Sequence, residues 1–399
     1  MLASPTTKDL SSDRTLTIAA YVSFIPVGIA TVLLGPLLPS LSARWSLNYS
    51  QAGALFTAQY FASTCAVALS GVLASRWGYR FAIKFGLLLM AAGLALLLSG
   101  PKWLGIFCIA AYGAGLGTAV PAANLAVADA NPERRSATLN LLNFFWSMGA
   151  VACPFLVAAA AKSNRLPLFL VCVSGFSLAV AIGIALLPAG TVQPSSKQEA
   201  GLNILSMIRA QLPAFMALAA LFFLYVGTEN AFGGWVATYA KTLPSLTPAM
   251  SLRTPSFFYA ALMLGRWIAP LLLRRLDEVR LVQVGLIVAC AGTAGLVVSH
   301  NLLSVVASAC AAGLGLSAVY PITIAFLSHQ FGAAASQIGS FMFVLSNIGG
   351  GLLPWIVGLL SNHSGTLTSG LFVPLSGCAL MFLLFLRGFR KATTVVPTS

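Results

Sequence analysis

Apolar residues fill the chain in long runs, and short polar segments separate them. A helix needs about 20 such residues to cross the hydrocarbon of a membrane. At roughly 33 residues for each helix with its loop, 399 residues hold about twelve crossings. The predicted spans are residues 16–40, 50–75, 81–99, 103–128, 136–161, 166–188, 209–240, 253–275, 281–299, 302–328, 334–361 and 367–388. This pattern predicts an all-α integral membrane protein.

The longest polar interruption, from Thr191 to Gly201, divides the spans into six plus six. Sliding the second half back by about 200 residues superimposes Gly113, Gly115, Pro121, Gly149 and Pro154 on Gly313, Gly315, Pro321, Gly349 and Pro354. Arg76, Gly86 and Gly93 meet Arg275, Gly285 and Gly292 at an offset of 199. We therefore predict two pseudo-symmetric six-helix bundles, residues 1–188 and 209–399, joined by a cytoplasmic linker over residues 189–208.

Composition agrees with a membrane protein, because 58% of the residues are hydrophobic and only 8% are charged. The net charge of +14 resides mainly in short loops, where it orients the protein, so we expect no nucleic-acid partner. With both termini cytoplasmic, that side holds fifteen lysines and arginines and the other side six. We expect a monomeric, multi-pass protein of the cell inner (plasma) membrane with both termini in the cytoplasm.

The predicted loop between the second and third spans, residues 71–80, reads GVLASRWGYR. It resembles the loop signature of the major facilitator superfamily, in which an aspartate normally takes the place of Ser75. The resemblance and the charges nearby predict a cytoplasmic gate that contains Gly71, Arg76, Gly78, Arg80 and Asp129. The alternative is that the arginines only anchor the loop at the membrane surface. The neutral Ser75 predicts a weaker helix cap than an aspartate.

A second resemblance covers two helices. Its residues are Tyr225, Gly227, Glu229, Gly233, Gly234, Trp235 and Tyr239 in one helix and Phe258, Leu264, Gly265 and Arg266 in the next. Together they resemble the fucose-permease-like branch of the superfamily, which includes sugar permeases and sodium-dependent glucose transporters. Many members share this pattern, so it does not identify the substrate.

Glu229 is the one acidic residue well inside a predicted span. Burying it ionised near the bilayer centre costs on the order of 3 kcal/mol, so it should line a wet cavity, pair with a cation, or hold a proton. Arg266 is the one basic residue in mid-span, and helical rise places it within about 9 Å of Glu229 along the membrane normal. The pair either locks two helices permanently or takes part in function, with Glu229 as the site of proton coupling.

Amide and aromatic side chains also lie within the predicted spans, and they suit a neutral polyhydroxylated solute. The predicted substrate-binding residues are Gln59, Asn124, Asn143, Trp146, Glu229, Asn230, Trp235, Arg266, Tyr320 and Asn347. The alternatives are that the amides join helices and that Trp235 belongs to an interfacial aromatic belt.

These features predict a secondary active transporter that moves a small polar solute, a sugar or sugar-like compound, by alternating access and proton symport. Uniport and sodium symport remain open, and the competing function is proton-coupled efflux of amphipathic drugs or other metabolites. The three histidines lie in or beside loops without paired acids, so we expect no enzyme. The cysteines lack a CxxC spacing and no GxxxxGK[ST] motif occurs, so we expect no metal and no cofactor.

Overall fold

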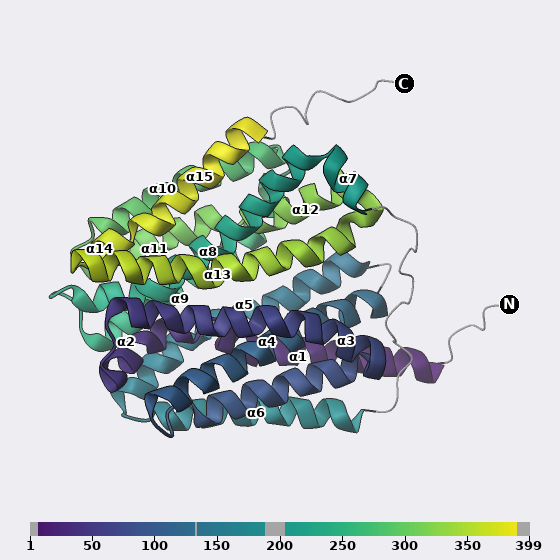
Figure 1. The fold of residues 1–399 in the computed structure, drawn as a ribbon, viewed down its shortest axis with the longest axis horizontal. Coiled ribbons are helices and arrows are strands. Elements are labelled where there is room, and N and C mark those ends of the chain that lie inside the picture. The colour runs from purple at the N-terminus through teal and green to yellow at the C-terminus, as the bar shows by residue number, and fades with distance from the viewer. Residues whose placement is uncertain (1–6, 132–133, 188–203, 389–399) are drawn as a thin grey trace. The chain divides into compact units, whose positions relative to one another are not determined.

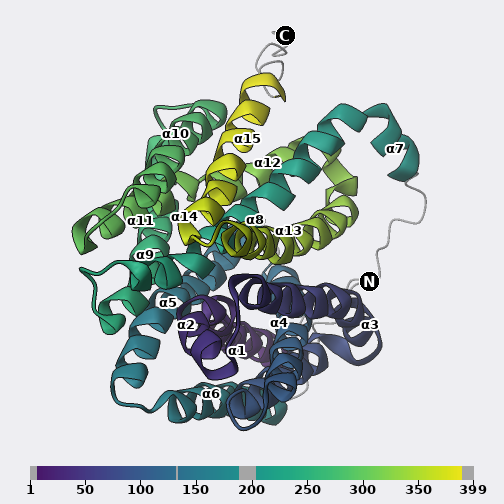
Figure 2. The same cartoon turned by 60° about the vertical axis from the view of Figure 1, so that its left-hand side comes forward.

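The computed structural model of the chain describes residues 7–131, 134–187 and 204–388 (Figures 1 and 2). Every regular element in these ranges is a helix. The helices are α1 (Thr7–Val32), α2 (Leu34–Trp45), α3 (Tyr49–Leu96), α4 (Lys102–Ala130), α5 (Arg135–Lys162), α6 (Leu166–Leu186), α7 (Ile204–Ala210), α8 (Leu212–Thr242), α9 (Pro248–Leu272), α10 (Glu278–Val297), α11 (Leu302–Leu316), α12 (Val319–Phe331), α13 (Ala335–Ser364), α14 (Leu367–Gly370) and α15 (Phe372–Gly388), with a 3₁₀ turn, η2 (Gly332–Ala334).

Ten stretches of the described chain are long and apolar enough to cross a membrane. One of them, α3, has 48 residues and contains two of the predicted spans, separated at Gly78 by a non-helical backbone with φ 81° and ψ 163°. Helix α9 corresponds to a further predicted span but is not among the ten, and it carries Arg253, Arg266 and internal prolines. The helices therefore follow the twelve predicted crossings, and the predicted all-α membrane fold is confirmed.

Three predicted spans are each divided into two helices, and a proline explains each division. A proline ring collides with the carbonyl group four residues earlier and breaks the helix there. Pro36 acts in this way on Val32, where α1 ends, and Pro374 acts on Gly370, where α14 ends. Between α11 and α12 the break falls at residues 317–318, four positions before Pro321.

By its internal contacts the chain forms two compact units. Unit 1 contains residues 1–34 and 58–198, and unit 2 contains residues 35–57 and 199–399. Most of the predicted linker, residues 189–203, lies outside the described residues. The bundle boundaries expected from the sequence, residues 1–188 and 209–399, stay a prediction.

In unit 1, helix α1 packs against α4, α5 and α6. In unit 2, helix α8 packs against α9, α13 and α15, and α10 lies against both α11 and α15 (Figure 2). Residues 35–57 also lie against α8 and α13, since Gly35 meets the backbone of Gly233 and Thr57 Oγ1 donates to Gly351 O at 3.1 Å. Unit 2 therefore includes the chain from Gly35 through the first turns of α3.

Glycines hold helix backbones together in the same way in both units, as the repeat predicts. A Cβ atom on Gly86 or Gly115 would overlap the other residue's carbonyl oxygen, and Gly285 and Gly315 face each other likewise. In the same manner Gly149 lies against Ile25 O and Gly349 lies against Phe223 O. Such close backbone approach is the usual way that helices associate inside a membrane.

We predict that Gly149→Ala and Gly349→Ala lower stability, because the added methyl group overlaps a backbone oxygen. Overpacking of this kind costs about 1–3 kcal/mol. Gly175→Ala and Gly183→Ala are matched controls on α6, where no atom lies within 4 Å of the added Cβ, and they should leave stability unchanged or raise it slightly. Thermal unfolding of the four purified variants in detergent checks this, and equal melting temperatures would contradict it.

Candidate functional site

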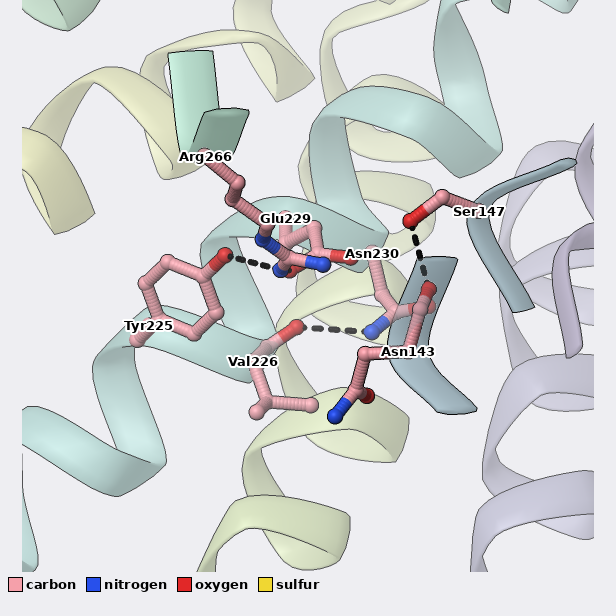
Figure 3. Close-up of polar contacts among 7 residues, drawn as sticks. All are labelled: Asn143, Ser147, Tyr225, Val226, Glu229, Asn230 and Arg266. Atoms are coloured by element: carbon pink, nitrogen blue, oxygen red, sulfur yellow. Dashed lines mark hydrogen bonds and ion pairs between the residues drawn. The ribbon is translucent and has the colours of Figure 1, made fainter. Parts of the chain in front are cut away.

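The ion pair expected between α8 and α9 is present in unit 2 (Figure 3). Arg266 Nη2 lies 4.0 Å from Glu229 Oε2, and the two side chains are 21% and 11% exposed. At this distance the two groups attract one another without a direct hydrogen bond. The prediction of a pairing is confirmed, whereas the roles of both residues in binding stay predictions.

Tyr225 completes this group and was not among the predicted site residues. It precedes Glu229 by four residues, so both side chains lie on one face of α8. Its hydroxyl accepts a hydrogen bond from Arg266 Nη2 at 3.2 Å. The same guanidinium therefore contacts both the phenol and the carboxylate. The four-residue spacing from Glu229 is the sequence signal that could have identified it.

Tyr320, a predicted binding residue on α12, lies beside this group. Its ring stacks on that of Tyr225 with centroids 5.1 Å apart and meets Phe222 edge-on at 5.6 Å. Aromatic pairs in these two geometries hold one another in place. Tyr320 is half-buried, so it supports Tyr225 and keeps part of its own surface open.

The other predicted residues of unit 2 differ in their surroundings. Trp235 is fully buried and donates from Nε1 to Pro354 O at 2.9 Å, which links α8 to α13. Burial rules out the interfacial belt as an explanation of this ring. Asn230 Nδ2 donates to Val226 O at 2.8 Å in its own helix (Figure 3). Asn347 is half-buried on α13 and makes no side-chain hydrogen bond within the described part of the chain.

In unit 1 a neutral hydrogen-bond network surrounds Gln59, which is only 2% exposed. Its amide accepts from Tyr112 OH at 3.1 Å and donates to Thr31 O at 3.4 Å. Trp146 Nε1 donates to Thr31 Oγ1 at 3.3 Å. The network thus joins α1, α3, α4 and α5, and it agrees with the alternative that amides join helices. A substrate contact by Gln59 stays a prediction.

Asn124 and Asn143, also in unit 1, leave an acceptor available. Each donates from Nδ2 to the carbonyl four residues earlier, Val120 O at 2.8 Å and Leu139 O at 2.9 Å. Within the described residues the side-chain oxygen of each makes no hydrogen bond. Asn143 is exposed, so its amide oxygen can accept from a solute hydroxyl group.

In the predicted cytoplasmic gate, the carboxylate of Asp129 contacts a tyrosine. Asp129 Oδ2 accepts from Tyr79 OH at 2.6 Å, a contact that sequence reasoning missed. Arg80 Nη1 donates to Leu187 O at 3.5 Å, just past the C-terminus of α6. Gly71 is exposed, and Gly78 holds the positive φ that interrupts α3. A gating role for these residues and Arg76 stays a prediction.

Comparison with known proteins places this arrangement in a family. The sequence profile of the Major Facilitator Superfamily matches residues 20–354. The chain belongs to the major facilitator superfamily. A glucose/galactose transporter of Brucella abortus is 26% identical over 371 residues, which cover 86% of each chain. The L-fucose-proton symporter of Escherichia coli is 25% identical, over an alignment that covers 92% of this chain and 90% of the symporter.

Solved structures of superfamily members share the fold. A crystal structure of FucP in the outward conformation matches 94% of this chain and 99% of its own, with a TM-score of 0.66 at 22% identity. A D-xylose-proton symporter matches 94% of this chain and 97% of its own, with a TM-score of 0.78 at 15% identity. The protein is therefore a multi-pass membrane protein of a transporter family.

We predict that Glu229 and Arg266 are energetically coupled. Arg266→Gln leaves a buried carboxyl group without its cation and should destabilise the protein by about 3–5 kcal/mol. Adding Glu229→Gln should recover part of that loss, because the double variant buries no unpaired charge. Thermal unfolding in detergent of the two single variants and the double variant measures the coupling. Strictly additive effects would show that the 4.0 Å contact has no energetic importance.

Proposed function

We propose that this protein is a secondary active transporter that moves a small polar solute, a sugar or sugar-like compound, by alternating access and proton symport. The observation that carries the proposal is the group formed by Glu229, Arg266 and Tyr225, buried among the helices of a major facilitator fold. A membrane protein retains a buried acid and base of this kind chiefly where they bind a substrate or carry an ion.

The sugar assignment rests on chemistry and on the relatives. In unit 1, Asn143 presents an open amide oxygen and the half-buried ring of Trp146 offers a flat apolar face, and both kinds of group suit a polyhydroxylated solute. In unit 2, the half-buried ring of Tyr320 offers a face of the same kind. Relatives that match most of the chain are named as glucose/galactose, glucose/mannose and L-fucose transporters. Both arguments favour a sugar over an amphipathic drug.

Proton coupling rests on the surroundings of Glu229. Protonation of this carboxyl group would weaken its attraction to Arg266, so the proton changes how the helices α8 and α9 hold each other. One proton moving down a potential of 100 mV releases about 2.3 kcal/mol, enough for roughly fiftyfold accumulation of substrate. A mouse relative, 20% identical, is named as a sodium-dependent glucose transporter, which keeps sodium as the competing coupling ion.

Alternating access requires a contact that opens and closes, and residues 35–57 provide a candidate. This segment packs on α8 and α13 within unit 2, although the chain on either side of it belongs to unit 1. Its contacts with α8 and α13 include glycine against backbone, as where Gly53 lies against Trp355, and ring against ring, as where Tyr49 meets Trp235 edge-on. We propose these contacts as the outer gate. We also propose that the protein lies in a bacterial-type inner membrane. By the positive-inside rule, both of its termini face the cytoplasm.

We predict that a sugar stabilises the purified protein and that its affinity depends on pH. If one proton on Glu229 accompanies the sugar, affinity should rise as the pH falls, by up to about tenfold per pH unit. Glu229→Gln should remove this dependence, whereas Glu278→Gln, at the start of α10, should keep it. Thermal-shift titrations with a panel of sugars at several pH values, with and without sodium, make the measurement.

The results separate the alternatives. A pH dependence that survives in Glu229→Gln would assign the proton to another group, and a sodium requirement would replace proton symport. If hydrophobic cations stabilise the protein and no sugar does, the function is efflux of amphipathic compounds.

A further inference from the structure

A repeated pattern of basic and aromatic residues marks the chain around the kink in α3. A basic residue precedes an aromatic residue three times at intervals of four: Arg76 and Trp77, Arg80 and Phe81, Lys84 and Phe85. After the break at Gly78 the backbone is helical, so Arg80 and Lys84 lie on one face, and Phe81 and Phe85 lie on a neighbouring one. Arg76 and Trp77 precede the break, and the Trp77 ring continues the aromatic series because it lies against the Phe81 ring. We call these six residues the basic–aromatic stripe.

The aromatic half of the stripe lies on the surface of unit 1. Trp77 is 58% exposed and Phe81 is 37% exposed. The Trp77 and Phe81 rings lie with centroids 5.1 Å apart, and the Phe81 and Phe85 rings stack at 6.3 Å, only 8° from parallel. Leu88, 46% exposed, continues the apolar surface along α3. The rings therefore form a continuous apolar surface that starts at the predicted cytoplasmic loop and runs into the predicted span 81–99.

Two of the three basic residues have no partner in the part of the chain that the structure describes. Arg76 is exposed and Lys84 half-buried, and within the described chain neither makes an ion pair or a hydrogen bond. Arg80 is anchored to Leu187 O. Residues 71–90 contain no acid, and the nearby Asp129 accepts a hydrogen bond from Tyr79. Because Lys84 lies about one turn inside a predicted span, its ammonium group has to extend toward the surface and meet an anion there.

We propose that the basic–aromatic stripe binds one anionic phospholipid. Its phosphate lies against Arg76 and Lys84, and the upper part of an acyl chain lies along the rings of Trp77, Phe81 and Phe85. Arg76 and Lys84 have no acidic partner among the described residues, and two such cations favour a headgroup with net negative charge over a zwitterionic one. The apolar surface beside them favours a lipid over a soluble anion, because the free phosphate ion has nothing to place against the rings.

The second half of the chain supplies an internal control. At the offset of 199, Arg275 corresponds to Arg76, whereas Leu276, Arg280 and Val284 take the places of the three aromatic residues. In addition, Arg280 pairs with Asp277 at 3.1 Å. This equivalent loop is also basic, but it lacks the rings and has an acid of its own. A general attraction between basic loops and lipid would act on both loops, whereas the proposed site is confined to the first.

Native mass spectrometry of the purified, delipidated protein tests the proposal. It counts bound lipids during titration with phosphatidylglycerol, which is anionic, or phosphatidylcholine, which is zwitterionic. We expect one tight phosphatidylglycerol that phosphatidylcholine and inorganic phosphate do not displace. Arg76→Gln and Lys84→Gln should each weaken its binding about fivefold, as expected for one cation near an anionic headgroup. Trp77→Ala should also weaken it, and Arg275→Gln should leave it unchanged.

Several results would overturn the proposal. Equal binding of the two lipids would remove the role of charge, and displacement by inorganic phosphate would indicate a soluble anion. An effect of Arg275→Gln equal to that of Arg76→Gln would indicate general attraction to basic loops. Lys84→Arg, which keeps the charge, should retain binding, and melting temperatures without lipid identify any variant that is misfolded. Arg76→Gln changes an exposed side chain, so it decides the question if the Lys84 variants do not fold.

Discussion

Close approach of helix backbones at glycine is the interaction on which both units depend. Inside a bilayer, lipid is as apolar as leucine, so burying apolar side chains does little to hold helices together. Contact between backbones therefore has to supply the attraction, and it requires residues without side chains at the crossing points. Gly86 with Gly115 and Gly285 with Gly315 provide this contact at equivalent places in the two units. The glycine contacts fix where the helices cross, and the crossings determine where the polar side chains on those helices lie.

Among these apolar helices, burial of the Glu229 carboxyl group costs free energy. A carboxyl group among membrane helices is tolerated when a cation, a hydrogen-bond donor or a proton offsets the loss of water. Here the guanidinium of Arg266 lies 4.0 Å from the carboxylate and also donates to the phenol of Tyr225 at 3.2 Å. A direct bidentate contact would hold the acid ionised more firmly. The looser arrangement is compatible with the proposed coupling role, which requires the carboxyl group to exchange a proton.

The sequence was sufficient for the fold because span length, charge bias and the offset of 200 are all local or periodic signals. The proline breaks were not readable in the same way, because Pro321 divides its span whereas its repeat equivalent, Pro121, lies inside the continuous helix α4. The site was only partly readable. Tyr225 is readable in part from its four-residue spacing to Glu229, whereas its bond with Arg266 and the bond of Tyr79 with Asp129 depend on how neighbouring helices pack. Gln59 was identifiable as unusual, but its burial and its partners depend on how α1, α3 and α4 pack.

The repeat also shows where the two halves differ chemically. Ile25 O faces Gly149 in unit 1 as Phe223 O faces Gly349 in unit 2, so these residues occupy equivalent places. Six residues further along each helix stand Thr31 and Glu229. In unit 1 the position holds a hydroxyl group within a neutral network that includes Trp146, and in unit 2 it holds a carboxyl group beside a cation. A duplicated scaffold with one neutral and one ionisable centre can divide two tasks between its halves. Neutral hydrogen bonds suit the recognition of an uncharged solute, and the ionisable centre suits the response to a proton.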